Sequence, residues 1–249
     1  YITLNAQRHL AASLAMSQQL TQDIVIIDSG STDQTLTIAK TYNCRIIHQD
    51  WLGFSAQKQM AINAAQYDWV LFLDADEVLS PEAVTDIKAN LFTDLSTGQA
   101  VAAYSLPRRN WFQGKWIKHG SWWPDRVTRL VNRTLGRMKT VPVHECWETE
   151  GTVLALQSVI EHYSYNNYSE LIHKADRYSS LAAGHLYTQN HHCTRWSPLG
   201  HSLVAFIRLF ILKQGFRDGV EGAAIAYTAA LASFMKYAKL QELWRTQNS

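Results

Sequence analysis

Two aspartates that directly follow a buried-strand pattern are the residues best placed to do chemistry. The run Trp69–Leu73 is uniformly apolar, as in a parallel strand covered on both faces, and it ends in Asp74-Ala75-Asp76. Alternate residues of an extended chain point the same way, so both carboxylates can face the crevice where open α/β sheets bind ligands. Two carboxylates repel unless a cation lies between them, and oxygen ligands suit Mg²⁺ or Mn²⁺ completed by substrate phosphates. The pattern therefore predicts a divalent-cation site.

The same aspartates also have a purely structural interpretation. Ser80 is a typical N-cap and Pro81 suits the first helical position, so the segment can simply lead into a helix that ends near Leu95. In that case Asp74 and Asp76 are no more than an acidic approach to a helix. The neighbouring segments decide between the two interpretations.

A second apolar run, Ile24–Ile27, also ends in a carboxylate, Asp28, and continues into the small polar turn Ser29–Asp33. Such a segment can be an ordinary strand–turn–helix connection. It also presents free backbone N–H groups and the positive end of a helix dipole to a ligand. A nucleotide-binding turn and a plain connection both fit this stretch.

Capping residues predict where two helices begin. Asn5 is expected to cap a helix that begins near Ala6. Ser31 and Gln34 have the spacing of a capping box for a helix that begins at Thr35.

Strands and helices alternate from the start of the chain to Asp76. A short strand, Arg45–His48, and a helix from about Ala56 to Ala65 complete the series before the Asp-x-Asp strand. This alternation predicts a right-handed, parallel α/β sheet. Asp28 and Asp74 then end their strands at the same edge of that sheet.

Three segments of the chain resemble the inverting family 2 glycosyltransferases, which have the GT-A fold, a mostly parallel Rossmann-like sheet flanked by helices. They are Ile2–Asn5, Val25–Asp33 and Leu71–Glu77. The resemblance implies that Asp28 contacts a nucleotide base and that Asp74 and Asp76 hold a divalent cation, Mg²⁺ or Mn²⁺, against a nucleotide diphosphate. It also places Lys58 by the nucleotide, although Lys58 can equally be a solvated helix residue. The residues expected to bind the nucleotide-sugar are Thr3, Asn5, Asp28, Ser29, Asp33, Lys58, Asp74, Ala75 and Asp76.

The most aromatic region of the chain lies between Trp111 and Trp123, interleaved with Arg and Lys. Aromatic rings can stack on sugars and basic groups can pair with phosphates, which makes Trp122 and Trp123 candidates for the acceptor site. The polar spacing by Gly114, Gly120 and other small residues predicts a loop, where exposed aromatics often face ligands. The alternative is an aromatic core beneath that loop.

Two further segments sharpen the resemblance to the bacterial lipopolysaccharide-core β-1,4-glucosyltransferase subgroup. They are Trp123–Val131, with proline, aspartate and arginine in succession, and Val141–Glu145. Inverting transfer needs one base to deprotonate the acceptor hydroxyl. Glu145 is the candidate base by its position relative to the metal motif, and Asp125 is the runner-up. His144 would orient Glu145 or touch the diphosphate, unless it is a structural histidine. Arg126 and Arg129 would contact a phosphate, unless one of them forms only a structural ion pair.

Composition limits the class of protein. The 249 residues carry 47% hydrophobic and 18% charged residues, as in a globular protein, and a formal net charge of +2 argues against nucleic-acid binding. The 3 cysteines lie far apart, which favours a reducing, cytoplasmic setting without disulfides or structural zinc. Residue 1 is Tyr within what resembles a strand end, so the natural start is expected to lie upstream.

Helical periodicity replaces the strand pattern in the last third of the chain. We expect a catalytic domain over residues 1–165 and a helical region over 166–249. A helix opened by Pro198 and another from about Val220 are apolar with Lys or Arg at their ends, which suits attachment to the inner face of the cytoplasmic membrane. They can equally pack on the catalytic domain or on a partner subunit, which leaves an oligomer open.

The sequence therefore predicts a metal-dependent inverting glycosyltransferase. Its resemblance implies transfer of a hexose, glucose from UDP-glucose, to an inner-core heptose of lipopolysaccharide or lipooligosaccharide, a lipid-linked saccharide. Alternative acceptors are a protein, a polysaccharide or a polyprenyl phosphate. Two other functions are a nucleotidyltransferase, disfavoured because Thr3–Ala6 is not a Gly-rich basic loop, and a non-catalytic carbohydrate-binding protein that uses the Trp-rich segment.

Overall fold

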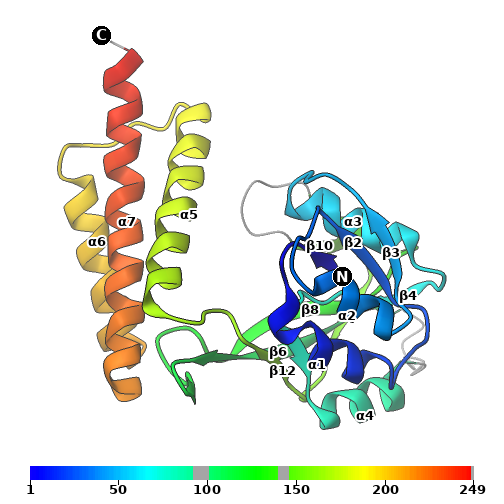
Figure 1. The fold of residues 1–249 in the computed structure, drawn as a ribbon. Helices are drawn as coiled ribbons and strands as arrows, with labels where there is room; N and C mark the ends of the chain where they lie inside the picture. Colours follow the sequence, from blue (N-terminus) through cyan, green and yellow to red (C-terminus); the bar gives the residue numbers. More distant parts are fainter. Residues whose placement is uncertain (92–100, 140–145, 248–249) are drawn as a thin grey trace. The chain divides into compact units, whose positions relative to one another are not determined.

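The computed structural model describes residues 1–91, 101–139 and 146–247, and the chain divides into two compact units (Figure 1). The first unit comprises Tyr1–Arg109 with Asp125–Tyr163, and the second comprises Asn110–Pro124 with Ser164–Ser249. The sequence interpretation drew its boundary at residue 165. The structure differs in that residues 110–124 belong with the helical region.

A parallel sheet begins the first unit. Its strands lie in the order β1 (Ile2–Thr3), β2 (Val25–Asp28) and β3 (Arg45–His48), and both pairings are parallel. Thr3 lies opposite Asp28, and Ile2 forms a parallel bridge to Asp74. Asp28 and Asp74 therefore lie on either side of β1 at one edge of the sheet, as the sequence predicts.

Four helices lie in the described part of this unit. They are α1 (Gln7–Ser17), α2 (Thr35–Thr41), α3 (Phe54–Ala64) and α4 (Pro81–Asn90). Leu10 and Leu14 of α1 are fully buried in one core cluster with Ile26 of β2. Because these leucines are four residues apart, they project from the same face of the helix onto the sheet.

The second sheet is mixed rather than mostly parallel. Its strands follow the order β4 (Trp69–Leu71), β8 (Asp125–Asn132), β6 (Val101–Phe112), β12 (Ile160–His162) and β5 (Glu77–Leu79). β8 runs antiparallel to both β4 and β6, β12 runs antiparallel to β5, and β11 (Thr152–Ala155) is parallel to β6. Two short strands, β9 (Gly136–Met138) and β10 (Trp147–Thr149), form an antiparallel pair. The α/β class is confirmed, but the predicted crossover pattern holds only for the first half.

The two predicted N-terminal caps are wrong. Helix α1 has Ala6 at its N-cap without a side-chain hydrogen bond, and the Asn5 side chain instead accepts a hydrogen bond from the Thr32 amide, at 2.8 Å. Ser31 turns back to donate its hydroxyl to Asp28, while the Thr35 amide of α2 donates to Asp33. Both polar side chains serve the turn between β2 and α2 rather than the helices.

The predicted cap of α4 is confirmed. The Ser80 hydroxyl accepts a hydrogen bond from the Ala83 amide, at 3.1 Å, and Pro81 occupies the first turn. We expect Ser80→Ala to lower the free energy of unfolding by about 1 kcal/mol, because a buried helix-start amide loses its acceptor. Thermal denaturation should show the loss, whereas Ser169→Ala, an exposed serine in a first helical turn, should stay within about 0.5 kcal/mol. Equal effects of the two changes would contradict the capping role.

Helices dominate the second unit. They are α5 (Tyr168–Thr188), α6 (Ser197–Phe206), the π-helical η1 (Ile207–Leu212), the 3₁₀ turn η2 (Gly215–Asp218) and α7 (Gly219–Gln247). α7 packs against both α5 and α6 (Figure 1). The helical region expected after residue 165 is confirmed, including the helix opened by Pro198 and the one from about Val220.

The Trp-rich segment is only partly a loop. β6 turns at Gly114 into β7 (Lys115–Trp116), and the rings of Trp111 and Trp116 meet edge to face at 4.8 Å between centroids. Phe112 is fully buried in a cluster with residues of α5 and α7. The prediction of an exposed loop is wrong here, because aromatic rings of this segment pack in the core of the second unit.

Candidate active site

Asp28 organises the turn after β2. Its carboxylate accepts hydrogen bonds from the Thr3 hydroxyl at 2.7 Å, from the Gly30 and Ser31 amides at 2.9 and 2.8 Å, and from the Ser31 hydroxyl. Burial would raise the pKa of Asp28, but these hydrogen bonds outweigh it and the pKa is lowered. Asp28 is therefore a fixed carboxylate that shapes the turn.

The other expected residues of this turn lie close by. The Ser29 hydroxyl accepts a hydrogen bond from Gln57 of α3 at 3.0 Å. Asp33 accepts hydrogen bonds from the Thr35 and Gln7 amides, at 2.9 and 3.2 Å, and so ties the starts of α1 and α2 together. The structure brings Thr3, Asn5, Asp28, Ser29 and Asp33 together.

Asp74 lies between two buried basic side chains. One carboxylate oxygen is 2.8 Å from Nζ of Lys58, and the other is 2.8 Å from Nη2 of Arg129. The Lys58 and Arg129 side chains are only 4% and 8% exposed, so the alternative of a solvated Lys58 is excluded. Burial would raise the pKa of Asp74, yet the charges of Arg129 and Lys58 hold it far below its usual range.

Glu77 is the centre of an ionic network that the sequence interpretation missed. Its fully buried carboxylate accepts two hydrogen bonds from Arg129, at 2.7 and 2.8 Å, and one from Arg108, at 2.9 Å. Burial would raise the pKa of Glu77, but the Arg129 and Arg108 charges lower it to about 2. Arg129, proposed from sequence as a phosphate ligand, thus joins Glu77 to Asp74 by ion pairs.

Asp125 is held at the other end of this network. Nη2 of Arg108 is 2.7 Å from its carboxylate, and Nε of the same guanidinium donates to it at 2.9 Å. The neighbouring Arg126 donates to the Ser105 and Leu156 carbonyls, at 3.0 and 2.8 Å, so it fastens β8 to the sheet. The chain of contacts Lys58–Asp74–Arg129–Glu77–Arg108–Asp125 connects the metal motif to the runner-up base.

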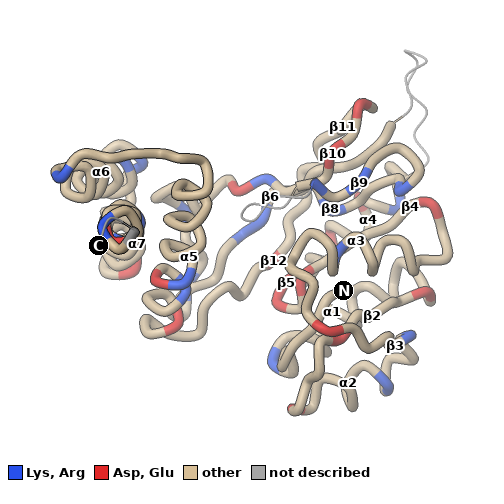
Figure 2. Tube along the Cα trace, turned by 90° about the horizontal axis from the view of Figure 1, so that it is seen from above, with Lys and Arg blue, Asp and Glu red and all other residues tan. Residues whose placement is uncertain are grey.

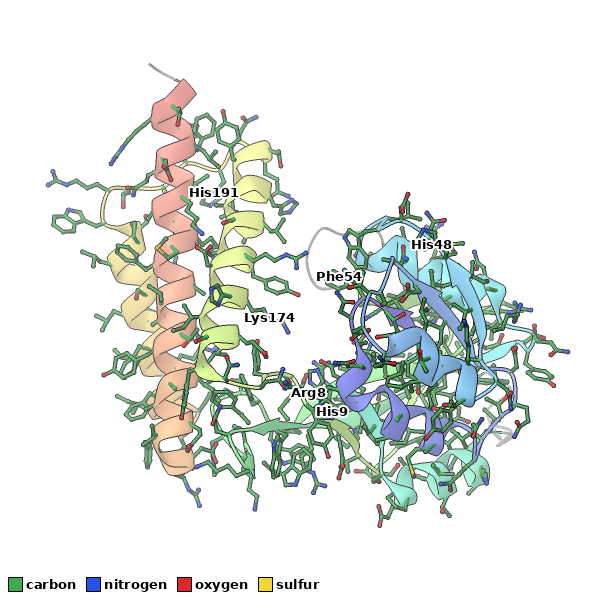
Figure 3. The ribbon with its side chains drawn as sticks, viewed as in Figure 1. Arg8, His9, His48, Phe54, Lys174 and His191 are labelled. Carbon is green, nitrogen blue, oxygen red and sulfur yellow. The ribbon has the colours of Figure 1, made fainter. Side chains whose placement is uncertain are left out.

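Asp76 differs from Asp74 in its surroundings. Its side chain is 39% exposed, and Nε2 of His162 in β12 lies 3.5 Å from its carboxylate. The ring of His9, on the first turn of α1 (Figure 3), stacks on Tyr163 with centroids 4.4 Å apart. Burial lowers the pKa of His9, while the charge of Asp76 acts to raise it. His9 and His162 escaped the sequence analysis, because neither lies in a recognisable motif.

Asp76 and His162 fit a divalent cation. A carboxylate oxygen suits Mn²⁺, an imidazole nitrogen is a common metal ligand, and the two atoms lie 3.5 Å apart. The part of the chain that the structure describes has no group of three or more His, Cys, Asp or Glu side chains that could hold a metal by itself. Any cation here needs further oxygens from substrate or water. Whether Asp74 is also a direct ligand stays a prediction, since both its oxygens already pair with cations.

The remaining predicted residues lie elsewhere or outside the description. Glu145 and His144 fall in residues 140–145, outside the described residues. Trp122 belongs to the second unit, where its ring stacks on Tyr165 with centroids 5.5 Å apart, as the core alternative expects. Trp123 is half-buried in that unit, and Ala75 packs beside the core of the first unit.

A cavity of about 760 Å³ lies away from this chemistry. It is lined by Tyr1, Ile24 and Trp69, which stand at the amino ends of their strands, whereas Asp28 and Asp74 follow the carboxyl ends. We place the site by its charged groups rather than by the volume of that cavity.

Comparison with known proteins decides the family. Residues 3–150 match the model of glycosyl transferase family 2. The chain belongs to this family. The matched residues include Asp28, Lys58, Asp74 and Asp76, so the family resemblance inferred from these motifs is confirmed.

Relatives extend the likeness to nearly the whole chain. An uncharacterized glycosyltransferase of Rickettsia prowazekii is 28% identical, with 97% of this chain and 85% of that protein covered. The lipopolysaccharide core biosynthesis glycosyltransferase LpsC of Rhizobium meliloti is 27% identical, with 97% and 90% covered. The structure of residues 1–349 of S. aureus TarS aligns with a TM-score of 0.45 and 13% identity, over 99% of this chain and 90% of that one.

Proposed function

We propose that this family 2 glycosyltransferase is metal-dependent and inverting, and that it moves a hexose, glucose from UDP-glucose, onto an inner-core heptose of lipopolysaccharide. The observation that carries the proposal is the paired arrangement after β4, where Asp74 is fixed by Lys58 and Arg129 while Asp76 stays open beside His162. Likeness to LpsC, whose name assigns it to lipopolysaccharide core biosynthesis, supports the choice of acceptor.

The donor would occupy the edge where β1, β2 and β4 end. Asp28 keeps the Ser29–Asp33 turn in one conformation, and its role in contacting a nucleotide base stays a prediction, because four hydrogen bonds already reach its oxygens. Lys58 and Arg129 supply buried positive charge beside Asp74. Such charge would stabilise a diphosphate as it leaves.

Asp76 and His162 would hold the divalent cation. When bound, a cation at this position neutralises charge that develops on the leaving diphosphate. His162 lies in β12, and Asp76 lies in the turn just before β5, the strand that pairs with β12. This strand pairing holds the two side chains close together.

His162→Ala should raise the Mn²⁺ concentration needed for half-maximal activity by about 10- to 100-fold, because the cation loses one protein ligand. Titration of Mn²⁺ at saturating donor measures this. His173→Ala, at an exposed histidine of α5, is the matched control and should leave the titration unchanged. An unchanged metal requirement in the His162 variant would remove this histidine from the site.

A base must take the proton of the acceptor hydroxyl as its oxygen attacks the anomeric carbon, while the bond to UDP breaks on the opposite face. Glu145 remains the candidate. Asp125, the runner-up, has one carboxylate oxygen, Oδ2, bound by Arg108 through two nitrogens, which fixes the orientation of its side chain. The structure therefore favours a positioning role for Asp125.

The test is a transfer reaction with UDP-glucose, Mn²⁺ and a core oligosaccharide that ends in heptose. We expect UDP release that depends on the acceptor, and a product whose anomeric proton shows a β-linkage by NMR, since inversion converts the α-linked donor. An α-linked product would overturn the inverting mechanism. Transfer from UDP-glucose to other acceptors only would retain the transferase and overturn the heptose assignment.

A further inference from the structure

One side of α6 and η1 exposes a continuous row of large apolar side chains. Leu203 and Val204 are 61% and 64% exposed, and Leu212 at the end of η1 is 71% exposed. We call this row the α6 face, and it consists of Leu199, Leu203, Val204, Ile207, Ile211 and Leu212. The spacing of three, four and one residues keeps these side chains on one side of the helix.

Other side chains of α6 and η1 have their own partners inside the second unit. Phe206 stacks on Phe210 with centroids 5.1 Å apart and meets Tyr227 of α7 at 4.7 Å. His201 stacks on Tyr237 of α7 at 4.0 Å. Aromatic contacts to α7 therefore already fix the helix, so the α6 face is not required for packing within this unit.

Charge around the α6 face has a single sign. The sequence contains no Asp or Glu between Asp176 and Asp218. Five exposed basic residues occupy the same stretch, and they are Arg177, Arg195, Arg208, Lys213 and Arg217. Figure 2 shows no red along α6. Trp196, 61% exposed, precedes the first turn of α6. A Trp at one end, aliphatic side chains along one face and long basic side chains around them are typical of helices that lie in a membrane interface.

We propose that the α6 face binds the surface of an anionic lipid bilayer, with its aliphatic side chains between the head groups and its basic side chains on lipid phosphates. No single helix among the described residues is long and apolar enough to span a membrane. Ser197–Leu212 and Gly215–Thr246 meet these criteria only together, with a bend of 67° between them. In the proposed arrangement the apolar row and the basic residues act on the same lipid leaflet.

A bilayer suits the α6 face better than a second copy of the chain. Two copies meeting through the same face would bring Arg208 and Lys213 of each against those of the other, with no acidic residue in the stretch to pair with them. Anionic head groups supply the missing negative charge. The inference rests on the proposed function in one respect, namely that a lipid-linked acceptor would lie in such a surface. Lipid binding itself needs neither donor nor acceptor.

Sedimentation of the full chain with vesicles tests the proposal. We expect binding to vesicles of phosphatidylcholine with phosphatidylglycerol, weaker binding to phosphatidylcholine alone, and a decrease with added salt. Leu203→Glu with Val204→Glu should lower the partition coefficient at least about tenfold, because two apolar side chains are replaced by charges that the anionic surface repels. Tyr67→Glu with Val153→Glu, at exposed apolar positions of the first unit, should leave it unchanged.

A second pair of variants isolates the charge. Arg208→Gln with Lys213→Gln should weaken binding about fivefold for each residue, and only to the anionic vesicles. UDP binding by each variant, measured by calorimetry, reports the catalytic unit separately from lipid binding. Equal binding of wild type and the Leu203/Val204 variant to vesicles would overturn the proposal. The proposal would also be overturned if wild type did not bind vesicles but formed a dimer, and the Leu203/Val204 variant were a monomer.

Discussion

Asp76→Ala is expected to lower kcat/KM for glycosyl transfer by about 1,000-fold, the scale of removing a group that stabilises transition-state charge. Asp76 is the acidic side chain of the Asp-x-Asp motif that is both 39% exposed and adjacent to His162, the second proposed ligand. Its loss removes the protein oxygen that would hold the cation. Initial rates at several Mn²⁺ concentrations measure the effect.

Asp68→Ala is the matched control for that change. Asp68 stands just before β4, is 66% exposed and is 3.6 Å from Nε of Arg133, so it offers a similar surface ion pair away from the motif. We expect its variant to retain wild-type activity, since isolated surface pairs contribute little. A wild-type rate in the Asp76 variant would mean that the Asp-x-Asp only leads into α4.

Glu77→Gln is expected to lower the free energy of unfolding of the first unit by about 3–5 kcal/mol. The neutral amide keeps the shape of the side chain but leaves Arg129 and Arg108 without their buried counter-charge. Thermal denaturation should show a fall of about 10 °C for a unit of this size. Glu148→Gln, whose side chain is 50% exposed, should change the melting temperature little.

The pH dependence gives Glu77→Gln a second readout. The pKa of Glu77 is lowered from 4.5 to about 2, so folding favours its charged form. Its contribution to stability is present above pH 4.5 and is lost as the pH falls toward 2. The variant should therefore lose less stability than wild type between these pH values. Parallel acid-denaturation curves for the two proteins would contradict the role given to Glu77.

Local patterns were enough to predict where Asp28 and Asp74 lie in the sheet. The apolar runs before Asp74 and Asp28 are each recognisable as strands from consecutive residues, and both aspartates lie at one edge of the sheet. Ser80 and Pro81 likewise start α4 as their types indicate. Each of these features depends on residues close together in the sequence.

Features that depend on distant residues were missed. Glu77 binds Arg108 and Arg129, which lie 31 and 52 positions later in the chain, so no local pattern pairs them. His162 reaches Asp76 only because β12 pairs with β5. The mixed second sheet was also missed, because the uniformly apolar run Trp69–Leu73 is typical of a parallel strand, whereas β4 pairs antiparallel with β8.

The Trp-rich segment shows a different limit. Its composition fits either sugar-stacking loops or a buried cluster, and the second unit uses Phe112 and Trp122 as core between the hairpin and the helices. Composition alone does not distinguish the two, because an aromatic ring contributes large apolar area in either setting. Whether the rings are buried depends on the helices that pack on them, which here are α5 and α7.

Calorimetric titration of UDP and UDP-glucose into the full chain, each with and without Mn²⁺, tests the central claim most directly. We predict that both nucleotides bind in the presence of Mn²⁺ and that Asp76→Ala abolishes this metal-dependent binding. Failure of both nucleotides to bind wild type, with or without the metal, would contradict the assignment of this sheet edge as a nucleotide-sugar site.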